Sequence, residues 1–206
     1  MSRRHSIGSG RLLLATTNPG KIREIGALLD GLSVVLVGLG DIPPVEAPDE
    51  TGATFAENAR LKARYYASAT GMPAVAEDSG LEVEALGGAP GVNSARYGGE
   101  DTSYPDKFRL IYDGLRAAGV ETSPARFVCA LALADSSAVL FEARGVVEGR
   151  IAPSPSGTGG FGYDPIFFYP PYGCTLAEVR ADQKSAVSHR GQAFRQLREY
   201  LHTLAR

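Results

Sequence analysis

Apolar residues in the first forty positions follow the pattern of a strand, then of a helix, then of a second strand. Residues 12–15 form a short apolar run, which predicts a buried strand. A polar loop at residues 16–21 follows this run. Apolar side chains then recur at helical spacing up to a stop at Gly31, namely at Ile22, Ile25, Leu28 and Leu29. Residues 34–37 predict the second strand.

The middle of the chain carries a helix signal followed by two strand signals. Thr54 and Glu57 match a capping box, which predicts a helix that runs to about Ala69. Residues 73–76 form a short apolar run, as expected of a buried strand. In residues 81–85 apolar and acidic side chains alternate, which predicts a separate, half-buried strand.

The second half of the chain predicts a helix, a hairpin and a C-terminal helix. Residues 106–118 form the first helix, and residues 127–134 and 138–147 form a hairpin around a polar turn. A helix that begins near Ser188 is predicted to bury one face, made of Phe194, Leu197, Leu201 and Leu204. Because helices and strands alternate first and hairpins follow, the sequence predicts an α/β fold with a mixed sheet.

Charge and composition narrow the class of protein. Lysine and arginine number 21 against 23 acidic residues, and both signs are scattered, so we expect no nucleic-acid partner. No apolar stretch resembles a signal peptide or a membrane anchor. Two cysteines without metal-ligand spacing predict a reducing, cytoplasmic location. Residues 1–10 are expected to be a disordered tail, and residues 11–206 a single domain.

The first loop has the chemistry of a phosphate site. Asn18, Gly20 and Lys21 stand between a buried strand and a helix start, where backbone N–H groups and the helix dipole favour an anion. The spacing of a P-loop is absent. An ordinary turn with a surface lysine explains the pattern equally well.

Two adjacent carboxylates, Glu77 and Asp78, follow the apolar run at 73–76. A buried strand ends in two acids only where a cation or hydrogen bonds compensate them, and Mg²⁺ is the cation that suits carboxylate and phosphate oxygens. Solvated loop acids are the simpler alternative. Asn58 and Lys62 lie four residues apart on one helix face, where solvation on the surface is also the simpler interpretation.

Two further segments suit a nucleotide. Cationic and hydroxyl side chains precede and begin the C-terminal helix, where cations oppose the helix dipole, so an anionic ligand or a solvated turn explains them. Phe161 and Tyr163 flank Gly162, and a base could stack there while Asp164 reads its edge. Core packing is the alternative for both rings.

In combination these segments closely resemble the inosine triphosphate pyrophosphatase, or Ham1-like, family. Six blocks carry the resemblance in order: ATTNPGK at 15–21, ETGATFAENA at 50–59, EDSGLEV at 77–83, LGGAPGV with SARY at 86–97, GFGYDPIF at 160–167, and KSAVSHRG at 184–191. The resemblance covers nearly the whole chain from Leu12 onward. It implies an elongated α/β fold with a mixed sheet, flanking helices and two lobes around a central cleft, and a homodimer.

The resemblance also implies an activity, namely Mg²⁺-dependent hydrolysis of dITP, ITP and XTP to the monophosphate and pyrophosphate. Asp78 would be the catalytic carboxylate, and Glu50 and Asp78 would engage Mg²⁺. Glu77 stands where the family often has Asp, which leaves open which acid touches the metal. The residues implied to hold the nucleotide are Thr16, Thr17, Asn18, Pro19, Gly20, Lys21, Lys62, Ser79, Phe161, Gly162, Tyr163, Asp164, Lys184, His189 and Arg190.

Three alternatives belong to other classes. A nucleotide sensor would keep the pocket without turnover, but Asp78 and Lys21 are both present. A Maf-type pyrophosphatase, acting on pyrimidine or modified nucleotides, is disfavoured by the Ser-His-Arg block at 188–190. A structural protein has little use for so many loops suited to phosphate.

Overall fold

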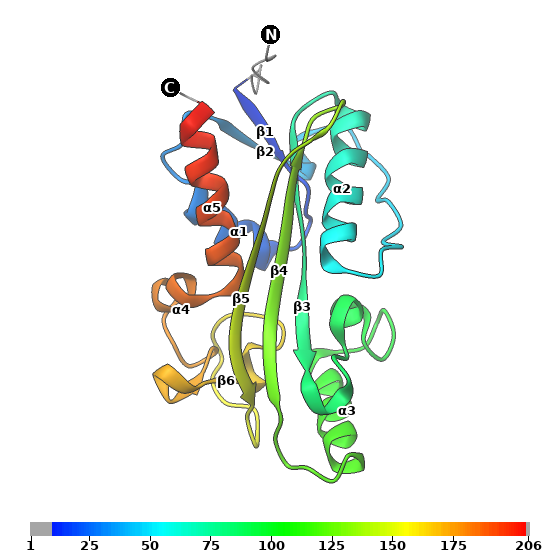
Figure 1. The fold of residues 1–206 in the computed structure, drawn as a ribbon, viewed down its shortest axis with the longest axis vertical. Helices are drawn as coiled ribbons and strands as arrows, with labels where there is room; N and C mark the ends of the chain where they lie inside the picture. The colour runs from blue at the N-terminus through cyan, green and yellow to red at the C-terminus, as the bar shows by residue number, and fades with distance from the viewer. Residues whose placement is uncertain (1–9, 205–206) are drawn as a thin grey trace. The chain divides into compact units, whose positions relative to one another are not determined.

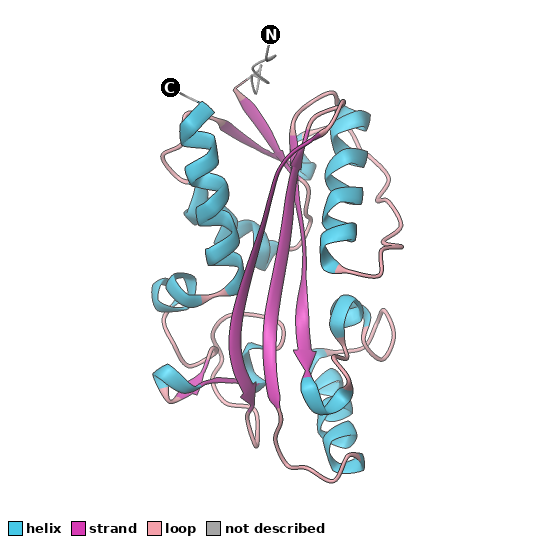
Figure 2. Ribbon diagram, in the orientation of Figure 1, coloured by secondary structure: helices cyan, strands magenta, loops and turns pink. Residues whose placement is uncertain are grey.

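The computed structural model describes residues 10–204, so the predicted tail, Gly10 apart, lies outside the described residues. The described part is α/β, as predicted (Figures 1 and 2). Its helices are α1 (Pro19–Leu29), α2 (Phe55–Thr70), α3 (Tyr104–Ala117), α4 (Ala181–Val187) and α5 (His189–Leu204). Its strands are β1 (Arg11–Leu14), β2 (Val35–Gly38), β3 (Ala74–Val83), β4 (Pro124–Ala134), β5 (Val139–Ile151), β6 (Phe167–Tyr169) and β7 (Cys174–Thr175).

The strands form one mixed sheet in the order β2-β1-β3-β4-β5-β6-β7. The strand β1 pairs in parallel with β2 and β3, whereas β6 pairs antiparallel with β5 and β7. The prediction of a mixed sheet is therefore confirmed. Among residues 10–204, no helix is long and apolar enough to cross a membrane.

The two strands predicted at 73–76 and 81–85 are in fact one continuous strand, β3. Polar residues at 77–79 suggested an interruption, but the Glu77 and Asp78 carboxylates are paired with cationic side chains and the strand runs on. Gly80 allows a close approach here, because a Cβ at this position would lie 2.2 Å from the Ser94 hydroxyl oxygen. The prediction of separate strands is wrong for this reason.

The described chain divides into two compact units. The first unit comprises residues up to Asp78 together with 129–145 and the residues from Arg190 onward. The second comprises residues 79–128 and 146–189. The strands β3, β4 and β5 each contribute residues to both units.

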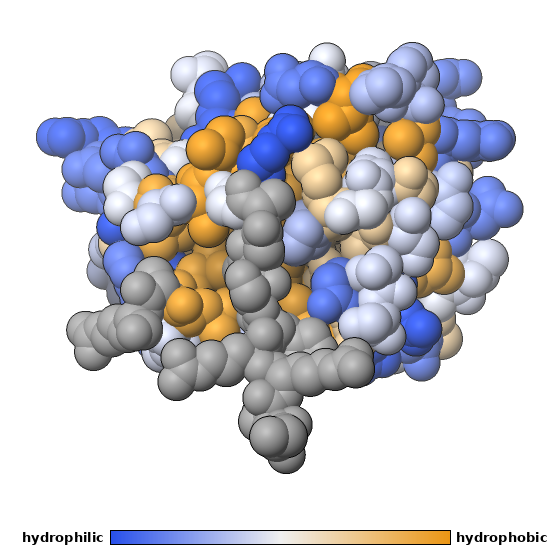
Figure 3. Space-filling model, turned by 90° about the horizontal axis from the view of Figure 1, so that it is seen from above, coloured by the Kyte–Doolittle hydropathy of each residue, from blue (hydrophilic) through white to orange (hydrophobic). Residues whose placement is uncertain are grey.

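The core of the first unit is built by α1 and α5 against strands β1, β3 and β4. Its buried side chains include Leu12, Ile25, Val75, Leu131, Phe194 and Leu197. The helix α2 lies on the opposite side of these strands (Figure 1). Leu204 is 42% exposed, so its predicted burial is wrong; the buried face of α5 ends at Leu201. Figure 3 shows this end of the unit, where apolar residues are visible among hydrophilic ones.

Local capping explains where the helices begin. Asn18 caps α1, which therefore begins at Pro19, three residues before the first predicted apolar position. Thr54 and Glu57 form the predicted capping box of α2. Ser103 caps α3, so this helix begins at Tyr104. The short helix α4 was not predicted.

The core of the second unit lies between α3 and the parts of β3, β4 and β5 that belong to this unit. It buries Leu81, Val83, Ile111, Phe127, Val147 and Phe167. Tyr163 and Ile166, from the loop before β6, belong to the same cluster. The loop that carries the aromatic motif is thus anchored in this core.

Candidate functional site

The loop between β1 and α1, in the first unit, is held by its own side chains. The Asn18 carboxamide oxygen accepts hydrogen bonds from the backbone N–H of Gly20 (2.9 Å) and of Lys21 (3.2 Å). The Thr16 hydroxyl accepts one from the N–H of Asn18 at 3.2 Å. The sequence suggested free backbone amides at this turn, and for Gly20 and Lys21 this is wrong because Asn18 caps them. Thr17 and Pro19 lie in the same preformed loop.

Glu77 lies at the centre of a buried charge network in the first unit. Its Oε1 lies 3.0 Å from the Lys21 ammonium and 3.0 Å from the Arg190 guanidinium. Its Oε2 accepts from the Cys129 thiol at 3.2 Å. Burial alone would raise the pKa of Glu77, but Arg190 and Lys21 hold this pKa well below its usual value. Glu77 is therefore an anion locked between two cations.

Arg190 belongs to the same network through a second carboxylate. Its guanidinium donates to Glu24 on α1 at 2.7 Å, and its side chain is 2% exposed. The resemblance implied that this residue helps to hold the nucleotide. The structure places its guanidinium against Glu24 and Glu77 instead of in an open position.

Asp78 has a different set of partners from Glu77, as expected of neighbours on an extended strand. Its Oδ2 accepts from the Asn58 carboxamide at 3.0 Å, and its Oδ1 lies 3.4 Å from the Lys62 ammonium. Lys62 also pairs with Glu50 at 2.5 Å. Burial raises the pKa of Asp78, and the charge of Lys62 only partly opposes this. For Lys62, burial alone would lower the pKa, but Asp78 and Glu50 outweigh it and raise it.

Protein cations therefore compensate both buried acids. The sequence interpretation that Mg²⁺ is needed to balance Glu77 and Asp78 does not follow, because Lys21, Arg190 and Lys62 already do so. The alternative of solvated loop acids is also wrong, since the two residues are 3% and 6% exposed.

Asn58 contacts the candidate site, although the sequence interpretation favoured a solvated position on the surface for it. It is fully buried, so surface solvation is wrong for it. Its carboxamide oxygen accepts from the N–H of Gly52 at 2.7 Å while its NH₂ donates to Asp78. It thus ties the loop that carries Glu50 to the strand that carries Asp78. The signal in the sequence that could have identified Asn58 is its position four residues before Lys62 on the same helix face.

The donors around Lys62 fit a divalent cation that is shared with a phosphate ligand. Glu50 and Asp78 both direct an oxygen at one ammonium, so their carboxylates already bracket a position for positive charge. Within residues 10–204, no group of three or more His, Cys, Asp or Glu side chains is arranged to hold a metal. Mg²⁺ commonly takes one or two carboxylates and completes its shell with water and substrate phosphates. Two carboxylates therefore suffice.

In the second unit, Asp164 and Lys184 form a buried pair beneath the aromatic loop. The Lys184 ammonium donates to Asp164 Oδ2 at 2.5 Å and lies 4.7 Å from the centre of the Phe161 ring. Asp164 also accepts from the backbone N–H of Phe161 at 2.7 Å. Lys184 comes from the unpredicted helix α4, and the pair fixes both the loop and the lysine.

The two rings of the aromatic loop differ in their surroundings. Tyr163 is 4% exposed, and its hydroxyl donates to the Ser94 carbonyl at 2.8 Å. The alternative of core packing is therefore correct for this ring. Phe161 is half-buried. Gly162 stands between them with φ of 69°, a conformation that favours glycine.

The remaining predicted residues of the second unit are Ser79 and His189. Ser79 is half-buried in β3. The His189 ring is buried and stacks on Phe127, with ring centres 4.9 Å apart. The structure therefore groups Phe161, Asp164 and Lys184 closely, while His189 packs against the core.

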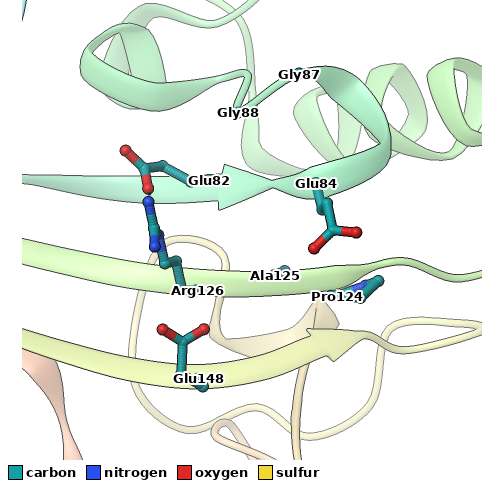
Figure 4. Close-up of a pocket in the computed structure, with 8 residues that line it drawn as sticks. All are labelled: Glu82, Glu84, Gly87, Gly88, Pro124, Ala125, Arg126 and Glu148. Atoms are coloured by element: carbon teal, nitrogen blue, oxygen red, sulfur yellow. Dashed lines mark hydrogen bonds and ion pairs between the residues drawn. The ribbon is translucent and has the colours of Figure 1, made fainter.

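A separate pocket in the second unit contains none of the predicted residues (Figure 4). It has a volume of about 320 Å³ and lies over β3, β4 and β5, where Arg126 points toward Glu82 at 2.6 Å. Glu84 and Glu148 also line it. Three carboxylates against one guanidinium do not suit a phosphate ligand.

Comparison with known proteins places the chain in a family. The sequence model of the Ham1 family matches residues 12–200. The dITP/XTP pyrophosphatase of Geobacter sulfurreducens is 47% identical over 191 residues, which cover 93% of this chain and 96% of that protein. The dITP/XTP pyrophosphatase of Thermus thermophilus is 51% identical over 193 residues, which cover 92% and 90%. A solved HAM1 protein from Coxiella burnetii gives a TM-score of 0.85 at 41% identity, covering 94% of this chain and 98% of that one. The chain therefore belongs to the Ham1 family, as the six motif blocks predicted.

Proposed function

We propose that this protein hydrolyses dITP, ITP and XTP to the nucleoside monophosphate and pyrophosphate, removing aberrant purine nucleotides. The observation that carries the proposal is the cluster of Asp78, Lys62 and Glu50, in which a buried carboxylate of raised pKa faces a lysine. Two relatives that match almost the whole chain are named dITP/XTP pyrophosphatases, which supports the same substrates.

The first unit carries the residues proposed for the phosphates. Lys21 and Lys62 supply positive charge, and residues 16–20 supply a preformed loop at the start of α1. The helix dipole adds partial positive charge at the same end. Each lysine is already paired with a carboxylate, so a phosphate oxygen would share its ammonium rather than meet it alone.

We propose Glu50 and Asp78 as the residues that hold Mg²⁺. When bound, this ion would neutralise phosphate charge and lower the pKa of a coordinated water. The Lys62 ammonium pairs with both carboxylates and so offsets part of their negative charge. The magnesium dependence of the activity is part of the proposal.

Asp78 is the proposed general base. It would accept a proton from the water that attacks the α-phosphorus, with pyrophosphate as the leaving group. Burial raises its pKa toward the range in which a carboxylate is a useful base. Asn58 orients it by donating to Oδ2, which leaves Oδ1 on the side of Lys62. No covalent intermediate is needed.

The second unit carries the residues proposed for the purine. Phe161 offers a ring face, and the Asp164–Lys184 pair fixes the loop beneath it. Ser79, Gly162, Tyr163 and His189 complete the proposed set in this unit. Donors near O6 of the base would favour a 6-oxo purine over adenine.

A cytoplasmic homodimer remains part of the proposal. The homodimer rests on the family resemblance, and the location rests on the two free cysteines, which are compatible with a reducing compartment.

Pyrophosphate release from dITP, XTP, dGTP, dATP and dTTP tests the proposal. We expect high kcat/KM for dITP and XTP and low values for the other three. Tight binding of dITP without any turnover would instead indicate a sensor. A preference for dTTP would point to Maf-type chemistry. Either result would overturn the proposed function.

A further inference from the structure

The acid before the proposed catalytic carboxylate has no open path to a ligand. The Glu77 side chain is 1% exposed, and both its oxygens have partners within the first unit. Arg190, which contacts it, is 2% exposed. A group enclosed in this way acts on a substrate through a neighbour.

That neighbour is Lys21. Its side chain is 18% exposed, so part of it reaches solvent, and its ammonium contacts Glu77 Oε1 at 3.0 Å. Lys21 stands in the first turn of α1, in the loop proposed for the triphosphate. It is the member of the network that joins Glu77 to that loop.

Glu77 is held by residues of two elements besides Lys21 on α1. Arg190 at the start of α5 donates to Oε1, and Cys129 on β4 donates to Oε2. Arg190 is anchored in turn by Glu24, which lies on α1 one turn beyond Lys21. Charges therefore alternate along the series Glu24, Arg190, Glu77 and Lys21. The series ties α1 to the strand β3, which carries both Glu77 and Asp78.

We propose that Glu77 is a positioning residue that fixes the Lys21 ammonium for the triphosphate, with Arg190 and Cys129 holding Glu77 in place. The inference rests on the proposed function for the role of Lys21. It gives Arg190 the role of supporting the residues proposed to bind the phosphates. It also assigns Glu77 no contact with the metal, which separates the role of Glu77 from that of Asp78.

The variant Glu77→Gln tests the proposal, because the carboxamide has the same shape without the charge. Removing a negative charge beside Lys21 does not weaken ground-state attraction for phosphate, so KM for dITP should stay level or fall. The kcat should fall by about tenfold to a hundredfold, because a misplaced binding group costs about that much. Glu142→Gln is the matched control. Its carboxylate pairs with Arg60 on the surface of the same unit, and kcat should not change.

A double-mutant cycle with Lys21→Met separates positioning from a general loss of structure. If Glu77 acts through Lys21, Glu77→Gln should lower kcat by less than about twofold in the Lys21→Met background. An equal fall in both backgrounds would overturn the proposal. So would a rise in the magnesium concentration needed for half-maximal rate, since that would make Glu77 a metal ligand.

Two further measurements keep the test decisive. Glu77→Asp keeps the charge and should retain more of the kcat than Glu77→Gln. If Glu77→Gln does not fold, Glu77→Asp replaces it in the double-mutant cycle with Lys21→Met. The ¹H–¹⁵N signal of the Lys21 ammonium, protected by its ion pair, should be present in the native protein and absent in Glu77→Gln. Its persistence in the variant would contradict the proposal. This signal needs no turnover, so an inactive native protein would sink the proposed function while the ion pair is still tested.

Discussion

The Asn58 carboxamide donates to the Asp78 carboxylate across 3.0 Å, although twenty residues of sequence separate them. The same carboxamide accepts from Gly52, so its orientation is fixed at both ends. One buried amide thereby sets the rotamer of the proposed base. It also sets the path of the loop that brings Glu50 to Lys62.

Asn58→Ala should lower both stability and turnover. A buried donor bonded to a carboxylate is lost, which should reduce the free energy of unfolding by about 1–3 kcal/mol. The kcat for dITP should fall because Asp78 loses the group that orients it. Urea denaturation and steady-state kinetics measure the two effects. Asn93→Ala, at an exposed asparagine, is the control and should change stability by less than about 0.5 kcal/mol. Unchanged kcat in Asn58→Ala would contradict the role given to Asn58.

The stability contributed by Glu77 should depend on pH. Its pKa in the folded protein lies well below the ordinary value of 4.5, so its ionised form stabilises the fold above pH 4.5. This contribution is lost as the pH falls below 4.5 and through the lowered pKa. The difference in unfolding free energy between the native protein and Glu77→Gln should therefore be constant near neutral pH and shrink in acid. Urea denaturation from pH 7 to pH 3, without magnesium or nucleotide, measures it. A difference that is independent of pH would refute the account.

Two glycines with the same φ allow the Asp164–Lys184 pair to be tested without replacing either residue. Gly160 and Gly173 both have φ of 67°, so alanine meets the same unfavourable φ at each. A Cβ at Gly160 would lie 2.1 Å from Asp164 Oδ2, whereas a Cβ at Gly173 meets nothing within 4 Å. Gly160→Ala should therefore raise KM for dITP severalfold. Gly173→Ala should cost only the roughly 1–2 kcal/mol of strain. Equal KM values in the two variants would show that this pair does not support the nucleotide.

Removal of magnesium should abolish pyrophosphate release, and Glu50 should set the concentration of metal that is required. Glu50→Gln should raise the magnesium concentration for half-maximal rate by at least the roughly tenfold that loss of an outer-shell metal partner costs. Glu46→Gln, at an exposed acid in the same loop, should leave it unchanged. Full activity in excess chelator would refute the metal proposal.

Much of the fold was predictable because local signals and tertiary packing agree. The capping box at Thr54 and Glu57 fixed the start of α2, and the apolar spacing in α5 predicted the burial of Phe194, Leu197 and Leu201. The strand β3 was split in the prediction, because local pattern treats two adjacent acids as a break. Their partners come from α1, α2 and α5, which a local pattern does not include.

The sequence proposes the candidate site as a set of residues but does not give their contacts. The family resemblance selected Lys21, Lys62 and Asp78. Spacing did not reveal that the Arg190 guanidinium pairs with Glu24 and Glu77, because 113 residues separate Arg190 from Glu77. Cys129 showed no signal at all, since a cysteine in an apolar run is an ordinary core residue.

The rate of pyrophosphate release from dITP by the native protein and by Asp78→Asn, with magnesium and isotopically labelled water, tests the central claim most directly. We predict that the native protein releases pyrophosphate and places the label in the monophosphate. The Asp78→Asn variant should fold and should turn over about 10²- to 10⁴-fold more slowly, as expected for loss of a general base. A rate in Asp78→Asn close to the native rate, or label in the pyrophosphate, would contradict the account.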